Sequence, residues 1–527
     1  INPRHFKEGR HDDLSKESSG TAQHYLLLEE FYRTGLLLAG RYPLWWLVPP
    51  GQEAHYEEYM KTLVEKRYVN PNEFIDFGNV AQVPAEEFFG AALWQLFKGI
   101  DSPYKSVLKL LLMEIYASQY PKINLLCRRF KTEIYNGETS LDRLDPYIML
   151  YRAIAEYLEQ SAEYDRLDFA RRCFYFKVNE RLSVQVNPRN VTWRRELMQS
   201  LAQEWGWGGV YLEMLDARSA WKINRVLRER KILVSELTHC YRILSNFARE
   251  HAGLMLINQK DITVLGRKLY AAFERKAGKL EIINRGISDD LWEGQVSLHQ
   301  FLSPEGQEMW ALFRGAVAAN EIGKNTPLKR GRTVCELMAW SYCNGLIDDR
   351  SSIVLHTQKS HLTMRELHSM MQVFRRAFPM NHIMETDIND LAHQAHVVTA
   401  ALFVNVGIDP LHQHTREGRH LTTARTDALN YSGLAENLAL TFDQVILSSW
   451  KEVLTFRYVG VDGLLSCLSE YLQWAPPGGD ASPTVPSVLC FSSNRGTAIG
   501  QRIRELFDDV ISCYYGDRDA RSARYIL

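Results

Sequence analysis

Apolar residues recur at spacings of three and four along the first half of the chain, and this pattern constrains the fold more than any other feature of the sequence. Such spacing places apolar side chains on one face of an α-helix. From Gln23 to about Ile257 it predicts helices at 25–38, 56–63, 85–97, 102–116, 146–158 and 167–182. Ser102-Pro103 and Asp145-Pro146 mark helix starts, because Ser and Asp side chains accept from free first-turn N–H groups and proline needs no donor there. We therefore expect a first half built almost entirely of helices.

The pattern changes after a further helix at 261–273. Alternating or clustered apolar residues predict strands at 279–283, 295–299 and 309–313, followed by helices at 328–345 and 363–378. Beyond Pro379 the same reasoning predicts strands at 397–406, 439–442, 452–459 and 488–491, with helices at 463–474 and 497–510. No internal repeat is visible in the sequence. The predicted fold class is α+β, mainly α-helical in the first half, with a C-terminal α/β region.

Length and composition narrow the class of protein. A chain of 527 residues is longer than one hydrophobic core normally organises, so roughly two to four domains are expected. The net charge of −1 creates no field that would attract nucleic acid, and the apolar runs are shorter than the ~18 residues that span a bilayer. The eight cysteines include no C-x-x-C pair, which is typical of reduced core thiols. We expect a cytoplasmic protein with no integral membrane segment and no nucleic-acid partner.

One helix start suggests an anion site. Ser102 and Pro103 fit the cap and the first position of a helix that carries Lys105 and Lys109 one turn apart on one face. Free backbone N–H groups and two ammonium groups would suit a phosphate. A solvated basic face is the alternative, since a cation in the first turn opposes the helix dipole.

A second helix start points to the same chemistry. A small-residue loop beginning at Gly20 enters a helix that carries Gln23, His24 and Arg33, and Arg41 follows. Backbone N–H groups at that N-terminus could meet a triphosphate, with the two arginines as further cations. Taken alone, the segment is typical of an ordinary capped amphipathic helix.

Other motifs carry little chemistry. His393 and His396 could share a helix face, but no H-E-x-x-H context accompanies them or the histidines at 412, 414 and 420. No G-x-S-x-G and no P-loop are present. Asp517 and Asp519 form the single Asp-x-Asp pair, in a charged segment typical of a solvated loop. We predict no metal ligands within this chain.

A series of ordered motifs resembles one known family. The motifs are Ser19-Gly-Thr-Ala-Gln-His24, Leu26-Leu-Leu-Glu-Glu-Phe-Tyr-Arg-Thr34, Pro71-Asn-Glu-Phe74, Glu86-Glu-Phe-Phe-Gly-Ala91, Ile100-Asp-Ser-Pro-Tyr-Lys105, Leu144-Asp-Pro-Tyr147, Arg171-Arg-Cys-Phe-Tyr175, Trp193-Arg-Arg-Glu196, Glu204-Trp-Gly-Trp207 and Arg267-Lys-Leu-Tyr-Ala-Ala-Phe-Glu274. They resemble the class I adenylate cyclases of gammaproteobacteria. The agreement is dense from about Ser19 to Glu274 and thinner afterwards, as at Ser449-Trp-Lys-Glu-Val453.

The resemblance implies that ATP is converted to 3′,5′-cyclic AMP and pyrophosphate. It implies a catalytic part with a nucleotidyltransferase-like palm, in which a Gly-Ser loop and an Asp-x-Asp pair hold nucleotide and Mg²⁺. It also implies a regulatory part linked to the phosphocarrier protein of the sugar phosphotransferase system. The domains expected on this basis are the end of the palm (1–22), a helical part of the catalytic domain (23–257), its α/β end (258–385) and a partial regulatory domain (386–527).

The site residues follow from combining the helix starts with the resemblance. The expected triphosphate contacts are Lys105, Arg33 and Arg41, with Lys109 and Lys177 behind them. Gln23 and His24 are expected to line the nucleotide. Ser102 and Asp145 are expected to support the site, Asp145 by capping or bracing a helix.

Two departures from the family pattern matter. The chain has no Gly-Ser dipeptide and no Asp-x-Asp upstream of Gln23, so we expect an internal fragment whose metal carboxylates lie before Ile1 and which is inactive alone. Arg457 stands where enterobacterial members carry a histidine proposed as a phosphorylation site. Two alternatives stay open: a non-catalytic scaffold that binds phosphotransferase components, and a nucleotidyltransferase with an external acceptor.

Overall fold

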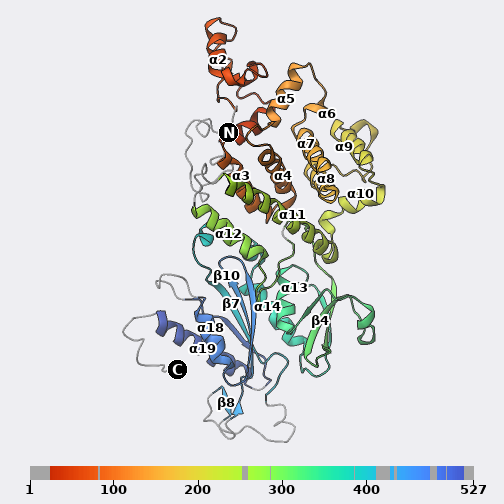
Figure 1. The fold of residues 1–527 in the computed structure, drawn as a ribbon. Coiled ribbons are helices and arrows are strands. Elements are labelled where there is room, and N and C mark those ends of the chain that lie inside the picture. The colour runs from red at the N-terminus through yellow and green to blue at the C-terminus, as the bar shows by residue number, and fades with distance from the viewer. Residues whose placement is uncertain are drawn as a thin grey trace. The chain divides into compact units, whose positions relative to one another are not determined.

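The computed structural model describes residues 24–80, 83–251, 259–284, 286–384, 386–410, 428–431, 436–474, 483–493 and 495–515. The predicted end of the palm (1–22), Gln23, the histidines at 412, 414 and 420, and Asp517 and Asp519 all lie outside these residues. The chain forms two compact units, the first comprising residues 1–219 and 228–266 and the second residues 220–227 and 267–527. Figure 1 shows the elements of both.

Unit 1 is helical, as predicted. Its helices in chain order are α1 (His24–Tyr32), α2 (Tyr56–Glu65), α3 (Ala85–Gly99), α4 (Pro103–Gln119), α5 (Leu126–Tyr135), α6 (Leu141–Leu144), α7 (Pro146–Gln160), α8 (Tyr164–Val178), α9 (Trp193–Glu204) and α10 (Gly209–Asp216), and α11 (Ile223–Glu250) and α12 (Gln259–Phe273) contribute residues to both units. A two-residue parallel pair, β1 (Tyr42–Pro43) and β2 (Phe74–Ile75), accompanies them.

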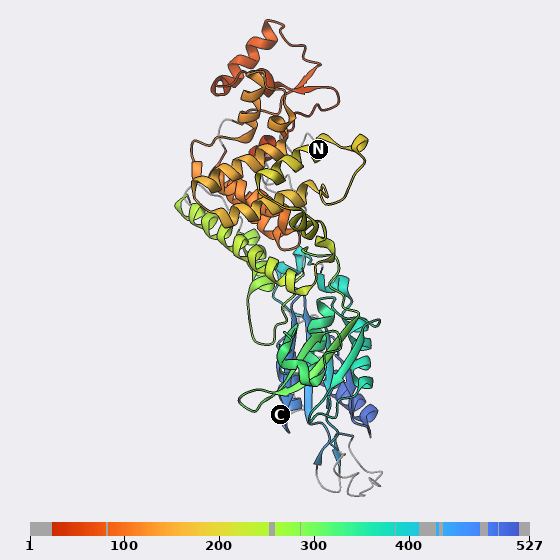
Figure 2. The same cartoon turned by 90° about the vertical axis from the view of Figure 1, so that its right-hand side faces the viewer.

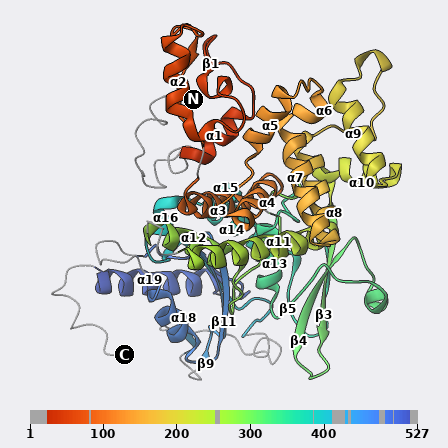
Figure 3. The ribbon, with the colours of Figure 1, turned by 45° about the horizontal axis from the view of Figure 1, so that its top comes forward.

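Helix α4 forms the centre of unit 1. It packs against α3, α7 and α8, which lie beside it in Figures 1 and 3. Nearly all of its side chains are buried, including Leu110, Leu111 and Tyr116. A helix that is apolar on most sides must be surrounded by other elements. The apolar run after Pro103 therefore explains the position of α4.

Two predicted helices end earlier than expected. The helix predicted at 25–38 stops at Tyr32, because Gly35 at φ +66° and a turn from Leu38 to Arg41 redirect the chain. The helix predicted at 167–182 stops at Val178, where Asn179 adopts a left-handed conformation at φ 59°. A left-handed residue is a common helix terminator, and Asn tolerates it better than most residues.

Unit 2 contains two four-stranded sheets, whose elements run from green to blue in Figure 2. The first sheet has the order β5 (Lys329–Gly331), β4 (Glu308–Arg314), β3 (Gln295–Leu302), β6 (Ser352–His356). The second has the order β11 (Val453–Val459), β10 (Thr441–Ser448), β7 (Val397–Val404), β12 (Ser487–Cys490). Short elements in the same unit are α15 (Met380–Met384), α16 (Ile388–Ala392), β8 (Asn430–Tyr431) and β9 (Glu436–Asn437).

The two sheets have the same topology. In the first, three strands are followed by α13 (Val334–Cys343), the fourth strand and α14 (Met364–Ala377); in the second, the same positions hold α18 (Gly463–Leu472), β12 and α19 (Gly496–Tyr515). In each, the first and last strands pair in parallel and the other neighbours are antiparallel. The topology therefore repeats, although no repeat is visible in the sequence.

The layers of unit 2 alternate between sheets and helices. Helix α13 packs on β4 and β5, and α14 packs on α13 and on β7, so these two helices lie between the sheets. Helices α18 and α19 cover the other face of the second sheet, where Phe442 and Ile446 of β10 belong to a buried cluster with Phe507.

Two sequence predictions need correction in unit 2, and one strand was missed. Residues 279–283 do not form a strand, and Lys279 makes only an isolated bridge to Leu454. The helix predicted at 328–345 starts at Val334, because residues 329–331 pair with β4 as strand β5 and Thr333 caps the helix. Strand β6 was not predicted. The mixed α+β class itself is confirmed.

Candidate nucleotide site

Helices α1 and α4 bring three of the predicted cations together around one carboxylate. The Lys109 ammonium lies 3.0 Å from both carboxylate oxygens of Glu30. Although burial favours the protonated acid, Lys109, Arg33 and Lys105 together lower the pKa of Glu30. Arg33, Lys105 and Lys109 therefore share one electrostatic neighbourhood, which we call the Glu30 cluster.

Arg33 is an internal member of this cluster. It is 6% exposed, and its guanidinium lies 3.8 Å from Glu29, one helical turn earlier. Glu29 also accepts hydrogen bonds from the Tyr116 hydroxyl at 3.1 Å and the Cys127 N–H at 3.2 Å. Burial raises the pKa of Glu29, and the charge of Arg33 opposes this shift. The sequence carried a signal for this pair, because Glu29 and Arg33 are four residues apart.

Lys105 is the exposed member. Its helix begins at Pro103, as predicted, and most of the neighbouring side chains are buried. Within the part of the chain that the structure describes, the Lys105 ammonium has no hydrogen bond or ion pair. It is the cation of the cluster best placed to meet a ligand from solvent.

Ser102 occupies the cap position of α4 without capping it. Its side chain makes no hydrogen bond to the first turn. The backbone at Ser102 has φ −134° and ψ 67°, away from the extended conformation that normally turns a cap hydroxyl toward these N–H groups. The prediction that the Ser102 side chain caps this helix is therefore wrong.

The N-terminus of α1 is already occupied by a protein carboxylate. Glu87 of α3 accepts hydrogen bonds from the N–H groups of Tyr25 at 2.9 Å and Leu26 at 3.0 Å. Burial raises the pKa of Glu87 to about 7, and these two N–H groups oppose the shift. In this structure the N–H groups of Tyr25 and Leu26 are thus bonded to Glu87 and are not free to meet a triphosphate. His24 lies beside them, and burial lowers its pKa.

Arg41 and Lys177 lie outside the Glu30 cluster. Arg41 is exposed at the end of the turn after α1, where its backbone pairs with Leu38. The Lys177 ammonium lies 4.8 Å from the ring centre of Tyr147. No described contact joins either side chain to Glu30.

Lys177 lines a small pocket together with Asp145. The pocket measures about 150 Å³ and is also lined by Trp193 and Arg194. Asp145 caps α7 by accepting from the N–H groups of Tyr147 at 2.8 Å and Ile148 at 3.2 Å. The capping function predicted for Asp145 is present.

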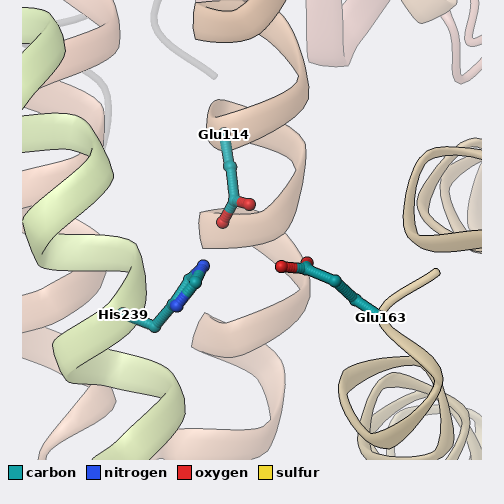
Figure 4. Close-up of side chains that lie close together, drawn as sticks. All are labelled: Glu114, Glu163 and His239. Carbon is teal, nitrogen blue, oxygen red and sulfur yellow. The ribbon is translucent and has the colours of Figure 1, made fainter. Parts of the chain in front are cut away.

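One group of side chains in unit 1 has the composition of a metal site. Glu114, Glu163 and His239 point toward one another in Figure 4, with one potential ligand atom from each within 4.8 Å of the others. Arg166 already binds both carboxylates, at 2.7 Å from Glu114 and 2.5 Å from Glu163. Its guanidinium also lies 2.8 Å from Glu236. A fixed cation in this position repels a second one, so these residues do not fit a resident Mg²⁺.

Comparison with known proteins identifies the class of protein first. Four domain models of adenylate cyclases match the chain in order: "Adenylate cyclase NT domain" at residues 1–46, and the second, third and fourth domains of "Adenylate cyclase, class-I" at residues 83–284, 295–382 and 385–527. Part of the N-terminal domain thus belongs to this chain.

Curated relatives narrow the class to one family. The adenylate cyclases of Salmonella typhimurium and Escherichia coli K12 are each 34% identical over 100% of this chain and 61% of their own length. That of Proteus mirabilis is 34% identical over 97% of this chain and 59% of its own length. The chain belongs to the class I adenylate cyclase family of gammaproteobacterial type, and it spans about 60% of the length of these relatives. No solved structure matches it.

None of the helices that the structure describes combines the length and apolarity needed to cross a bilayer.

Proposed function

We propose that this chain is part of an adenylate cyclase that converts ATP to 3′,5′-cyclic AMP and pyrophosphate. The observation that carries the proposal is the ordered match of four adenylate cyclase domain models from residue 1 to residue 527. Similarity to three adenylate cyclases, at 34% identity over 97–100% of this chain and 59–61% of theirs, supports it.

We further propose that the Glu30 cluster binds the triphosphate of ATP, with Lys105 making the direct contact. The exposed Lys105 ammonium supports this assignment, because a solvated triphosphate can reach it without disturbing the core. Lys109 and Arg33 would not contact the triphosphate directly, because carboxylates bind both of them. Their charges keep Glu30 ionised and in place. Arg41 is exposed and remains a second candidate for direct contact.

Lys177 and His24 have weaker support. The ammonium of Lys177 lies over Tyr147 in the pocket capped by Asp145. This pocket of about 150 Å³ is smaller than the 300 Å³ or so at which ligand sites usually begin. We propose that Lys177 and Asp145 support the helices of the catalytic part and that His24 borders the nucleotide in its neutral form.

The chemistry available to these residues is electrostatic. Cyclisation places the ribose 3′-oxygen on the α-phosphorus while pyrophosphate leaves, and negative charge builds on the leaving oxygens. A Lys105 ammonium beside those oxygens would stabilise that charge and fix the triphosphate. The family resemblance implies Mg²⁺, but Glu114, Glu163 and His239 do not fit it, because Arg166 already binds both carboxylates.

The test is Lys105→Ala in a longer protein that includes the sequence preceding Ile1. Loss of a direct phosphate contact should weaken binding of a non-cyclisable ATP analogue at least tenfold, or about 1.4 kcal/mol. Lys61→Ala is the matched control, because Lys61 is an exposed helical lysine on α2. Binding that stays within about twofold of the unsubstituted protein would exclude the phosphate contact. Cyclic AMP as the product would separate a cyclase from a transferase with an external acceptor.

A further inference from the structure

Unit 2 contains a pocket that the catalytic proposal does not use. It has a volume of about 700 Å³ and lies between the two repeated motifs. The first motif contributes Glu308 of β4, Val334 at the start of α13 and the loop 359–362. The second contributes the loop 406–410, Asp443 of β10 and Arg457 of β11. This volume falls in the range of roughly 300–1,000 Å³ typical of small-molecule sites.

Asp443 is a buried acceptor with an unused oxygen in the wall of this pocket. The residue is 2% exposed, and its Oδ2 atom has no hydrogen-bond partner among the described residues. Burial raises the pKa of Asp443 to about 6, and the charge of Arg457 and a hydrogen bond with the Thr333 side chain oppose the shift. Buried polar atoms in native proteins nearly always have a partner. Asp443 thus brings to the wall of the pocket a carboxylate that has one oxygen still able to accept a hydrogen bond.

Two cations in the pocket are also available. Arg457 faces Asp443 across the strand pair, but its Nε lies 4.0 Å from Oδ1, beyond hydrogen-bond distance. Its side chain is 34% exposed, and Lys359 is exposed. Neither cation donates a hydrogen bond to any described residue. Together they could bind an anionic group at the rim of the pocket.

The other carboxylates of the pocket are already hydrogen-bonded. Glu308 accepts from the Gln300 amide at 3.3 Å, and Asp409 accepts from the Ser493 hydroxyl. Among these three carboxylates in the described lining, Asp443 is the one with a buried oxygen that lacks a hydrogen-bond partner.

The loops that form the walls are held in place without a ligand. The side-chain oxygen of Gln300 accepts from three successive N–H groups of residues 358–360, at 2.8 to 3.0 Å. Gly407 has φ +65°, donates its N–H to Glu366 at 3.0 Å, and a Cβ at this position would collide with the Ser360 hydroxyl. A pocket with fixed walls loses little entropy when it binds a ligand.

We propose that this pocket binds a small anionic metabolite that carries an N–H donor: Asp443 accepts from the donor, and Arg457 and Lys359 bind the anionic group. A nucleotide with an amino-bearing base and an amino acid both have this chemistry. A divalent cation does not, since Arg457 would repel it, and a neutral sugar would leave both cations without a partner. The proposal is independent of the cyclase proposal.

The test is isothermal titration of the 527-residue chain with two pairs of probes. Adenosine 5′-monophosphate is compared with ribose 5-phosphate, and L-glutamate with 2-oxoglutarate; in each pair the second compound is anionic but has no N–H donor. We expect at least one amino-bearing probe to bind with a Kd below 1 mM and its partner compound to bind at least tenfold more weakly. The pair that behaves in this way identifies the source of the ligand.

Variants connect the binding to this pocket. Asp443→Asn should weaken the binding of the amino-bearing probe at least tenfold. Lys359→Ala, which changes an exposed side chain, should also weaken that binding. Lys324→Ala, an exposed lysine on the short helix 319–324, is the control and should change nothing. Absence of binding by both amino-bearing probes below 1 mM would overturn the proposal. So would binding that neither Asp443→Asn nor Lys359→Ala affects, because the ligand would then occupy another site.

Discussion

At the residue scale, partners from other helices decide which charges of unit 1 are available. Arg33 and Lys109 look equivalent to Lys105 in the sequence, yet Glu29 and Glu30 of α1 bind the first two. The same holds for the carboxylates Glu114, Glu163 and Glu236, which share Arg166. Pairs of this kind connect the helices. The charged side chains that remain exposed are the ones that a ligand can contact.

The Arg33–Glu29 pair leads to a stability prediction. Arg33→Ala leaves the buried Glu29 carboxylate without its counter-ion, and breaking a buried pair in this way typically costs about 3–5 kcal/mol. Lys105→Ala changes an exposed side chain and should alter stability by less than about 0.5 kcal/mol. Urea unfolding followed by tryptophan fluorescence measures both. Equal midpoints for the two variants would contradict the buried pairing.

Asp443 leads to a prediction about pH. Its pKa is about 6 in the folded protein, against about 3.9 in an unfolded chain, so between these values the folded state holds the proton more tightly. The free energy of unfolding therefore falls as pH rises from about 4 to about 6, by about 3 kcal/mol in total from this group. Asp443→Asn removes this contribution, so the variant should gain stability relative to the unsubstituted chain over that interval. Thermal unfolding at pH 4, 5, 6 and 7 measures the difference. A constant difference across the series would contradict the raised pKa.

At the scale of single elements, the two predicted helix starts differ in what stabilises them. Helix α7 has a side-chain cap, whereas α4 begins with proline and buries most of its side chains. Packing rather than capping therefore holds α4, in line with the rule that tertiary contacts supply most helix stability. Helix α1 is capped by Glu87, a residue 62 positions from Tyr25.

This difference can be measured with a matched pair of variants. Asp145→Ala removes two hydrogen bonds at the start of α7 and should destabilise the protein by about 1 kcal/mol. Ser102→Ala removes no cap bond and should change stability by only a few tenths of that amount. Urea unfolding under identical conditions provides the comparison, and a larger loss for Ser102→Ala would contradict the assignment.

At the scale of the whole molecule, unit 2 repeats one topology twice, and the pocket proposed above lies between the copies. Helix α13 packs on the first sheet, and α14 packs on α13 and on β7 of the second sheet, so the two helices connect the copies. The helical unit carries the cations proposed for the triphosphate. The two proposals thus assign small anions to residues of both units.

The local pattern of apolar residues in the sequence determined many of the helices and strands. Apolar periodicity predicted most helices of unit 1 and strands β3, β4, β7 and β11, because burial on one face imposes a period of 3.6 or 2 on the sequence itself. The cap at Asp145 could also be predicted from local sequence, because the N–H groups that it binds are only two and three residues away.

Only the tertiary structure decided which of these residues remain available for function. Glu87 occupies the N-terminus of α1 from another helix, Glu30 holds Lys109 across 79 positions, and Asp443 meets a cavity built by two motifs. Such contacts join residues that are distant in the sequence and depend on how elements pack, which a local pattern does not encode. The helical spacing in the first half thus predicted the presence of α1 and α4, and their packing decided that Lys105 is the cation exposed between them.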